Sequence, residues 1–145
     1  MKTPRRKRIA FDLDETLGVP QIDGAEIVGF RFREGCVELL QRLEKDFELI
    51  LWTVGSRRYV EKIVAFGLRK FFPEVYAWED ISTSWKDVRR IGADYLIDDS
   101  PHHFEEARKN GLTAHYIVIE AFGSPADFKD PHLWIRQIEE VLYQR

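Results

Sequence analysis

The stretch IAFDLDETLG, residues 9–18, decides how the rest of the chain is interpreted, because an apolar run ends there in two carboxylates one residue apart. The run from Arg8 to Leu13 has the length and composition of a buried β-strand. Side chains alternate along a strand, so Asp12 and Asp14 lie on one side while Leu13 points into the core. Two like charges this close are costly unless a cation or a proton lies between them. The pattern indicates a site for chemistry; the alternative is that both aspartates cap turns, a common use of this residue.

Four further apolar runs have strand character, and helical patterns separate most of the runs from one another. We expect strands at Arg8–Leu13, Glu48–Thr53, Val75–Trp78, Tyr95–Asp98 and Ala114–Ile119. Alternation of strands and helices is typical of a parallel sheet that is covered by helices on both faces. The predicted fold class is therefore α/β, a three-layer Rossmann-like fold with a mainly parallel sheet of about five strands and no cap domain.

Apolar stripes predict the positions of the helices. They are Val37, Leu39, Leu40 and Leu43; Val60, Ile63 and Val64; and Leu133, Ile135, Ile138 and Leu142 in a last helix from Pro131 to Tyr143. A further helix ends at Asn110 and Gly111, a common C-terminal cap. The last helix is expected to pack on the sheet.

Length and spacing favour one domain, residues 1–145, without repeats or interdomain linkers. Between the first two strands, residues 18–33 contain an alternating stretch that predicts a short hairpin or flap. Its alternating residues are Val28, Phe30 and Phe32 on one side and Gly29, Arg31 and Arg33 on the other.

Charge and composition exclude several classes of protein. The net charge of −3 gives no general attraction to nucleic acid, which leaves only the basic N-terminal arm, residues 1–7 with Lys2, Arg5 and Arg6, as a polyanion contact. A solvated tail is the interpretation that we favour for this arm. The chain contains neither an apolar run long enough for a membrane helix nor a signal sequence, so we expect a cytoplasmic protein. The single cysteine, Cys36, excludes an internal disulfide and suits a small buried helix position.

Two more predicted strands end in polar residues, and in such folds ligands bind at the carboxyl ends of the strands. The second strand ends at Thr53, followed by glycine and serine at a helix start, an arrangement suited to an anion. The fourth strand ends at Asp98 and Asp99. Carboxylates gathered in one crevice need a divalent cation and a fixed positive charge before they accept a phosphate. Lys86 is the candidate for that charge, although a single lysine on a helix is more often solvated.

These motifs resemble, in order and spacing, the four motifs of the haloacid dehalogenase superfamily. They are DLDETL at 12–17, WTVGS at 52–56, the lysine of WKD at 85–87, and DDSP at 98–101. The likeness is greatest to the capless branch of FCP/SCP-like phosphatases, the NLI-interacting-factor-like family. It extends to RFREGCVELLQRL at 31–43, WTVGSRRYV at 52–60 and WKDVRRIGADYLIDDSPHHF at 85–104, and so covers nearly the whole chain.

The resemblance implies a Mg2+-dependent phosphatase. Asp12 would be the nucleophile that forms an aspartyl-phosphate, and Asp14 would first protonate the leaving oxygen and then deprotonate the attacking water. Such roles suit two neighbouring carboxylates. By the same resemblance, Thr53, Val54 and Lys86 hold the phosphoryl group. Mg2+ is held by Asp12, the main-chain carbonyl of Asp14, and Asp98. Asp99 lies beside the metal, and Thr16 orders the motif loop.

The chain departs from the family pattern at two points. Glu34 replaces the usual proline before the first helix, and the stretch between Thr53 and Lys86 looks shorter than in the peptide-specific members. The phosphoserine-peptide specificity of those members therefore does not transfer. We expect a phosphorylated protein or other macromolecule as the substrate. The alternatives are a phosphatase or phosphotransferase for a small metabolite or nucleotide, and a catalytically silent module that binds a phosphorylated partner.

Aromatic and imidazole side chains near the predicted crevice are open to two interpretations. Trp52, Trp78 and Trp85 suit either packing in the core or at the rim of the crevice, which we favour, or stacking on a base or a peptide ring. His102 and His103 follow DDSP and would either contact the substrate or, as we favour, serve the structure.

Overall fold

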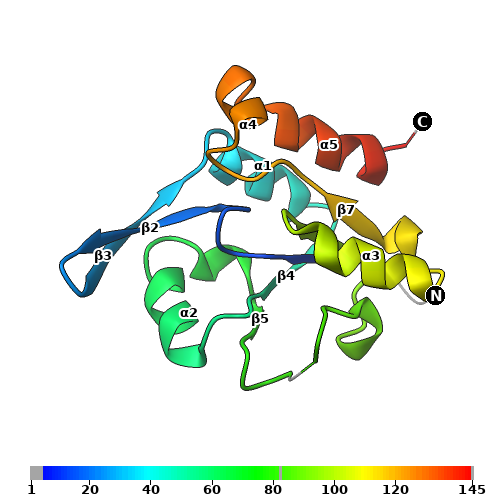
Figure 1. Cartoon of the computed structure of the whole chain (residues 1–145), viewed down its shortest axis with the longest axis horizontal. Coiled ribbons are helices and arrows are strands. Elements are labelled where there is room, and N and C mark those ends of the chain that lie inside the picture. The colour runs from blue at the N-terminus through cyan, green and yellow to red at the C-terminus, as the bar shows by residue number, and fades with distance from the viewer. Residues whose placement is uncertain (1–4, 82, 145) are drawn as a thin grey trace.

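Figure 1 shows the chain as a computed structural model, which describes residues 5–81 and 83–144. The central sheet contains β1 (Arg8–Phe11), β4 (Glu48–Trp52), β5 (Glu74–Tyr76), β6 (Tyr95–Asp98) and β7 (Tyr116–Val118). Their order is β5-β4-β1-β6-β7, and every neighbouring pair is parallel. The five predicted strands and the α/β class are confirmed, and β1 occupies the middle of the sheet.

Helices cover both faces of this sheet because side chains of each strand alternate between two cores. Ile9 and Phe11 of β1 pack in one core with α1 (Cys36–Leu43), α2 (Arg57–Val64) and α5 (Leu133–Leu142). Ala10 faces the other core, which includes Ala107 of α3 (Pro101–Lys109). Figure 1 shows this three-layer arrangement, with α3 lying apart from α1 and α5.

Two helical details differ from the prediction. The short α4 (Pro125–Lys129) was not predicted; Pro125 lies in its first turn, and the Ser124 side chain accepts a hydrogen bond from the Asp127 N–H. The last helix begins at Leu133, two residues after Pro131, because His132 occupies the N-cap position. A helix of five residues leaves no repeating apolar stripe, which is why the sequence pattern gave no sign of α4.

Residues 18–33 fold into an antiparallel hairpin of β2 (Gly18–Asp23) and β3 (Glu26–Phe32), which projects from the body of the molecule (Figure 1). The predicted alternation of side chains fails within β3. A register irregularity at Gln21 and Ile22 leaves Val28 53% exposed, whereas Gly29 is buried. A Cβ at Gly18 would lie 2.0 Å from the carbonyl oxygen of Arg31, so the hairpin can leave the β1 loop only through a glycine.

The basic N-terminal arm lies partly against the body. Arg5 donates a hydrogen bond to the carbonyl of Gly92, and Arg6 donates one to the carbonyl of Glu44. Lys2 of the predicted arm lies outside the described residues. Within the part of the chain that the structure describes, no helix is both long enough and apolar enough to cross a membrane.

Arg33, which the alternating pattern placed on one side of the hairpin, lies just after β3, connects three distant segments of the fold and is only 2% exposed. Its Nη2 donates to Asp127 Oδ1 at 2.7 Å, and its Nη1 donates to the carbonyls of Glu120 at 2.9 Å and Thr16 at 3.3 Å. The guanidinium also lies 4.4 Å from the ring centroid of Trp134 in α5. One side chain therefore holds the loop after β1, the end of the hairpin and the C-terminal segment together.

We expect Asp127→Ala to destabilise the protein by about 3–5 kcal/mol, because it leaves the Arg33 charge buried without its partner. The matched control is the double substitution Arg33→Met/Asp127→Leu, which removes both charges and should recover most of this loss. Urea unfolding of the three proteins measures both effects. A double variant that is no more stable than Asp127→Ala would contradict the assignment of the loss to an uncompensated charge.

Candidate active site

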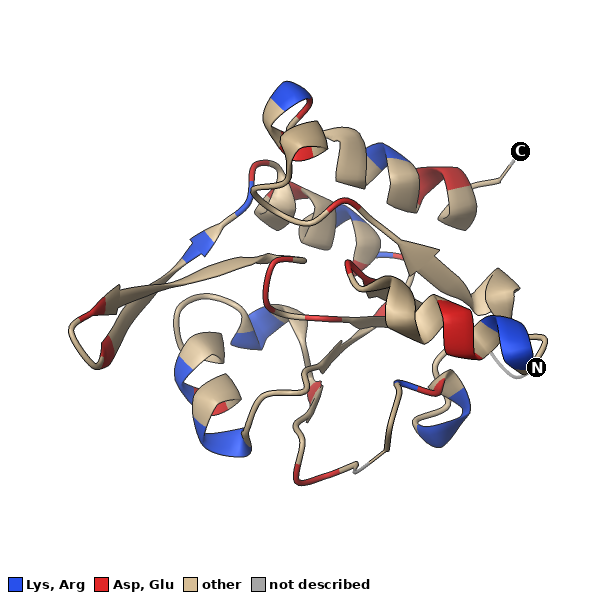
Figure 2. Cartoon of the chain, in the orientation of Figure 1, with Lys and Arg blue, Asp and Glu red and all other residues tan. Residues whose placement is uncertain are grey.

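The predicted site residues come from the carboxyl ends of three adjacent strands, which brings residues distant in sequence together. Asp12 follows β1, Thr53 follows β4, and Asp98 ends β6. Since β1 lies between β4 and β6, the three side chains meet at one edge of the sheet. Figure 2 shows the acidic segments after β1 and before α3 on facing sides of this edge.

Lys86 lies between two of the carboxylates. Its Nζ donates to Asp12 Oδ1 at 2.8 Å and to Asp98 Oδ2 at 2.9 Å, and its side chain is only 3% exposed. Burial lowers the pKa of Lys86, but the negative charges of Asp12 and Asp98 outweigh burial and hold this pKa above its usual value. Lys86 is therefore a permanent cation here, in an irregular segment before β6 and not on a helix.

Asp99 adds a third carboxylate to this group. Asp12, Asp98 and Asp99 each offer an oxygen within 4.8 Å of the others. Burial raises the pKa of Asp99 to about 7, and the hydrogen bond with Asp12 and the negative charge of Asp12 contribute to this increase. Three carboxylates against one ammonium leave an excess of negative charge, and carboxylate oxygens are the donors that Mg2+ and Ca2+ prefer. The residues of the cluster thus fit a divalent cation.

Thr16 connects the members of the cluster. Its hydroxyl lies 3.1 Å from both Asp12 Oδ2 and Asp99 Oδ1, so the single proton of this hydroxyl can be donated to either carboxylate. The preceding residue, Glu15, has a φ of 64°, and among the described residues it is the only non-glycine with positive φ. Such a conformation costs about 1–2 kcal/mol, which is typical of a functional loop held by its surroundings.

Asp14 has different surroundings from Asp12. Its carboxylate lies outside the three-residue cluster and accepts a hydrogen bond from the hydroxyl of Tyr59 in α2. Burial raises the pKa of Asp14, and the Tyr59 hydrogen bond opposes this effect. Asp12 and Asp14 thus follow one strand but have separate partners, the first a lysine and the second a tyrosine.

The loop after β4 turns directly into α2. Thr53 Oγ1 accepts a hydrogen bond from the Gly55 N–H at 3.0 Å, and Ser56 Oγ accepts one from the Tyr59 N–H at 3.1 Å. Thr53 is buried, whereas Val54 is 64% exposed. The predicted phosphoryl-binding residues Thr53 and Val54 therefore lie beside the first turn of a helix, close to Lys86, with which they line one small pocket.

Sequence reasoning favoured a structural role for His102 and His103 but did not identify the residues that position Lys86. The Lys86 N–H donates to His103 Nδ1 at 2.9 Å, and its carbonyl accepts from the Tyr116 hydroxyl at 2.8 Å. Burial lowers the pKa of His103 to about 4, so the ring is neutral and Nδ1 can accept. His102 contacts the Ser84 carbonyl at 2.9 Å. Both histidines thus hold the segment that carries Lys86; no pattern in the sequence indicates these contacts, since α3 meets this segment only in the folded chain.

Residues 7–130 match the family described as NLI interacting factor-like phosphatase. No curated protein sequence matches the chain at a significant level. Among solved structures, the chain is similar to Fcp1, an essential RNA polymerase II CTD phosphatase, with a TM-score of 0.65, 17% identity, and coverage of 97% of this chain and 50% of that one. A fission yeast Fcp1 variant bound to beryllium fluoride has a TM-score of 0.62, 14% identity, and coverage of 97% and 52%.

A putative β-phosphoglucomutase from Thermotoga maritima gives a TM-score of 0.59 at 13% identity, covering 85% of this chain and 90% of that one. At these identities the likeness concerns the fold. The chain spans about half the length of the two Fcp1 chains that it matches.

The contribution of Asp99 to the stability of the metal-free protein should fall as the pH rises from about 4 to about 7, whereas the lowered pKa of His103 acts in the opposite direction. The pKa of Asp99 is about 7 in the folded protein, against about 3.9 in an unfolded chain. In this range the folded protein therefore holds a proton that the unfolded chain has released, and raising the pH removes that advantage. Melting temperatures in EDTA between pH 4.5 and 7.5 measure the slope. Asp99→Asn should shift the slope of stability against pH in the positive direction, because it removes the contribution that falls with pH. Asp23→Asn, on the exposed hairpin, should leave the slope unchanged. Equal slopes in all three proteins would refute the placement of Asp99.

Proposed function

Because the chain belongs to the family of NLI interacting factor-like phosphatases, we propose that it is a Mg2+-dependent phosphomonoesterase that acts through an aspartyl-phosphate intermediate. The observation that carries this proposal is the set of contacts around Asp12. One of its oxygens accepts a hydrogen bond from Lys86, and its carboxylate belongs to the cluster with Asp98 and Asp99. A nucleophile beside a fixed cation and a cation-binding cluster suits phosphoryl transfer.

In the first step, a carboxylate oxygen of Asp12 attacks phosphorus while the bond from phosphorus to the ester oxygen breaks. Asp14 gives its proton to the departing oxygen, so that an alcohol leaves. The raised pKa of Asp14 supports this role, because burial favours the protonated form that a general acid needs. The hydrogen bond from Tyr59 holds the Asp14 carboxyl in place.

In the second step, water attacks phosphorus, Asp14 takes the proton of that water, and the bond between phosphorus and Asp12 breaks. Inorganic phosphate leaves, and both aspartates return to their starting states. Thr53, Val54 and Lys86 hold the phosphoryl group through a hydroxyl, a main-chain N–H and an ammonium. Mg2+, held by Asp12, Asp98 and the main-chain carbonyl of Asp14 with Asp99 beside it, would offset the charges of the carboxylates and the phosphoryl oxygens.

For the substrate, we propose an accessible phosphate on a protein or another macromolecule. In the described residues, only the hairpin of β2 and β3 and the segment between β5 and β6 extend beyond the repeated strand and helix units, and neither forms a covering domain. Fcp1, which shares the fold, is described as a phosphatase of the RNA polymerase II CTD, which is a protein substrate. We place this activity in the cytoplasm, on the composition of the chain. A panel of phosphopeptides, nucleotides and sugar phosphates, compared by kcat/KM, tests the substrate class.

We expect Asp12→Asn to lower kcat by about a thousandfold or more, because a carboxamide cannot act as the nucleophile. Asp14→Asn should lower kcat by about 10²–10⁴-fold on alkyl phosphates and by less on 4-nitrophenyl phosphate, whose leaving group needs no proton. Release of inorganic phosphate measures both, with Asp23→Asn as the control. Near-normal turnover in Asp12→Asn would rule out the covalent mechanism.

Mg2+ should raise the melting temperature of the wild-type protein, because it binds the carboxylate cluster of the native state only. At a free concentration about a hundredfold above Kd, the gain in stability is about 2.7 kcal/mol. Asp98→Asn keeps the size of the side chain and should lose most of this response, whereas Asp23→Asn should keep it. Ca2+ should stabilise the protein without comparable turnover. Equal Mg2+ shifts in wild type and Asp98→Asn, or full turnover in EDTA, would contradict the metal assignment.

A further inference from the structure

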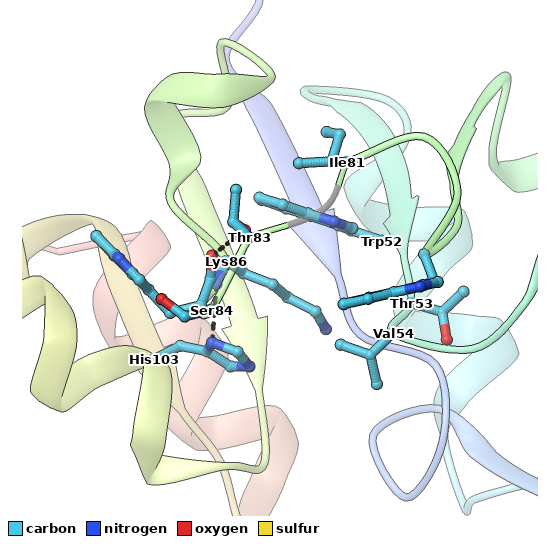
Figure 3. Close-up of a pocket in the computed structure, with 10 residues that line it drawn as sticks. Trp52, Thr53, Val54, Ile81, Thr83, Ser84, Lys86 and His103 are labelled. Atoms are coloured by element: carbon cyan, nitrogen blue, oxygen red, sulfur yellow. Dashed lines mark hydrogen bonds between the residues drawn. The ribbon is translucent and has the colours of Figure 1, made fainter.

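The proposed phosphoryl-binding residues Thr53, Val54 and Lys86 line part of a small pocket, and no step of the proposed reaction uses the rest of its wall. The pocket holds about 40 Å³ and lies between the loop after β4 and the segment that carries Lys86. Figure 3 shows Trp52, Thr53 and Val54 on one side of it and Ser84 and His103 on the other. We propose that this pocket binds a small aliphatic group of the substrate, attached close to the ester oxygen; the inference rests on the proposed phosphatase function.

The pocket lies where the organic leaving group of a bound phosphate ester can reach it. Thr53 and Lys86 line the pocket, and they are also the residues proposed to hold the phosphoryl group. The Lys86 ammonium is turned toward Asp12 and Asp98, at 2.8 and 2.9 Å. A phosphate held by these two residues therefore has the pocket as a direct neighbour, and the organic part of the ester is the portion of the substrate that is free to enter it.

Apolar side chains form half of the pocket lining, and they include the exposed residues at its mouth. Trp52 and Ile81 line it, and two residues at its mouth, Val54 and Trp78, are 64% and 50% exposed. A hydrogen bond of 2.9 Å from the Trp78 N–H to the Gly55 carbonyl fixes Trp78 next to the loop that carries Val54. Exposed apolar side chains that gather at the mouth of a pocket mark a binding surface, and they favour an apolar occupant.

Three polar side chains of the wall already take part in hydrogen bonds within the protein, which reduces the number of partners that they offer to a sugar or a nucleobase. Thr53 Oγ1 accepts from the Gly55 N–H, and Thr83 Oγ1 donates to the Trp85 carbonyl. His103 Nδ1 accepts from the Lys86 N–H. A hydroxyl-rich ligand placed here would lose its hydrogen bonds to water without gaining equivalent partners from these side chains, whereas an alkyl group loses nothing.

The volume limits the size of the occupant. A cavity of roughly 150 Å³ is the size that admits benzene in an engineered protein core. The 40 Å³ found here is much smaller, so the enclosed part of the pocket takes a group of a few carbon atoms and not a phenyl ring. This size corresponds to a short aliphatic side chain close to the phosphorylated oxygen.

A series of alkyl phosphates tests the inference directly. Methyl, ethyl, n-propyl and n-butyl phosphate have closely similar leaving groups, so that the demand on Asp14 stays constant while the apolar size grows. We expect kcat/KM, measured with Mg2+ by phosphate release, to rise by about fourfold for each of the first added carbons, the value for burying one methylene group. The rise should end by n-propyl or n-butyl phosphate, when the pocket is full.

Two substitutions change the pocket in opposite directions. Trp78→Ala removes part of the wall and should reduce the gain per carbon to less than about twofold. Ile81→Ala enlarges the pocket and should move the end of the rise to a longer chain. Phe128→Ala is the control, because Phe128 is 80% exposed but lines a different groove, and it should keep the wild-type chain-length profile.

The outcomes separate this inference from the function on which it rests. Turnover of all four esters without a dependence on chain length overturns the pocket assignment and leaves the phosphatase proposal intact. A chain-length dependence that is identical in wild type, Trp78→Ala and Ile81→Ala also overturns the assignment. Absence of turnover with every alkyl phosphate and with 4-nitrophenyl phosphate overturns both proposals.

Discussion

The ammonium of Lys86 between Asp12 and Asp98 is the interaction on which the rest of the site depends. All three groups are nearly buried, so each charge would carry a large desolvation cost if it were alone. Hydrogen bonds of 2.8 and 2.9 Å offset that cost and join the ends of β1 and β6 to the segment before β6. That segment has little regular structure, so its geometry depends on side chains of neighbouring elements. His103 of α3 accepts a hydrogen bond from the main-chain N–H of Lys86, and the Tyr116 hydroxyl of β7 donates one to the carbonyl of Lys86.

Arg33 is a second buried cation, and its structural role differs from that of Lys86. Lys86 lies among carboxylates and leaves the cluster with an excess of negative charge, which suits a divalent cation. Arg33 instead donates to Asp127 and to carbonyls, including that of Thr16, and so holds the loop that follows β1. Buried ion pairs of this kind contribute little net stability compared with apolar packing. Their presence around a loop that contains the strained Glu15 is consistent with a structure that favours the geometry of its site over stability.

Local pattern predicted the elements that repeat and failed where long-range packing decides. The five strands were predicted because each is a short apolar run bounded by polar residues. The alternation in β3 predicted a hairpin, but an irregular register exposes Val28, and the contact with Asp127, ninety-four residues away in sequence, buries Arg33. Lys86 was predicted as the phosphoryl-binding cation, but its surroundings suggested a solvated helix residue. Burial of a lysine becomes favourable only when two carboxylates meet it, and local sequence does not contain that information.

The sequence by itself determined the α/β class, the order of the strands along the chain, and the placement of Asp12, Thr53 and Asp98 at strand ends, because periodicity and strand-end chemistry are local properties. Only the tertiary structure decided which of these ends are neighbours, which carboxylate receives Lys86, that Tyr59 binds Asp14, and that three tryptophans surround a pocket next to Thr53. The physical reason is that hydrogen bonds and burial act over a few ångströms. The residues that satisfy them lie far apart in the chain until the sheet brings its strand ends to one edge.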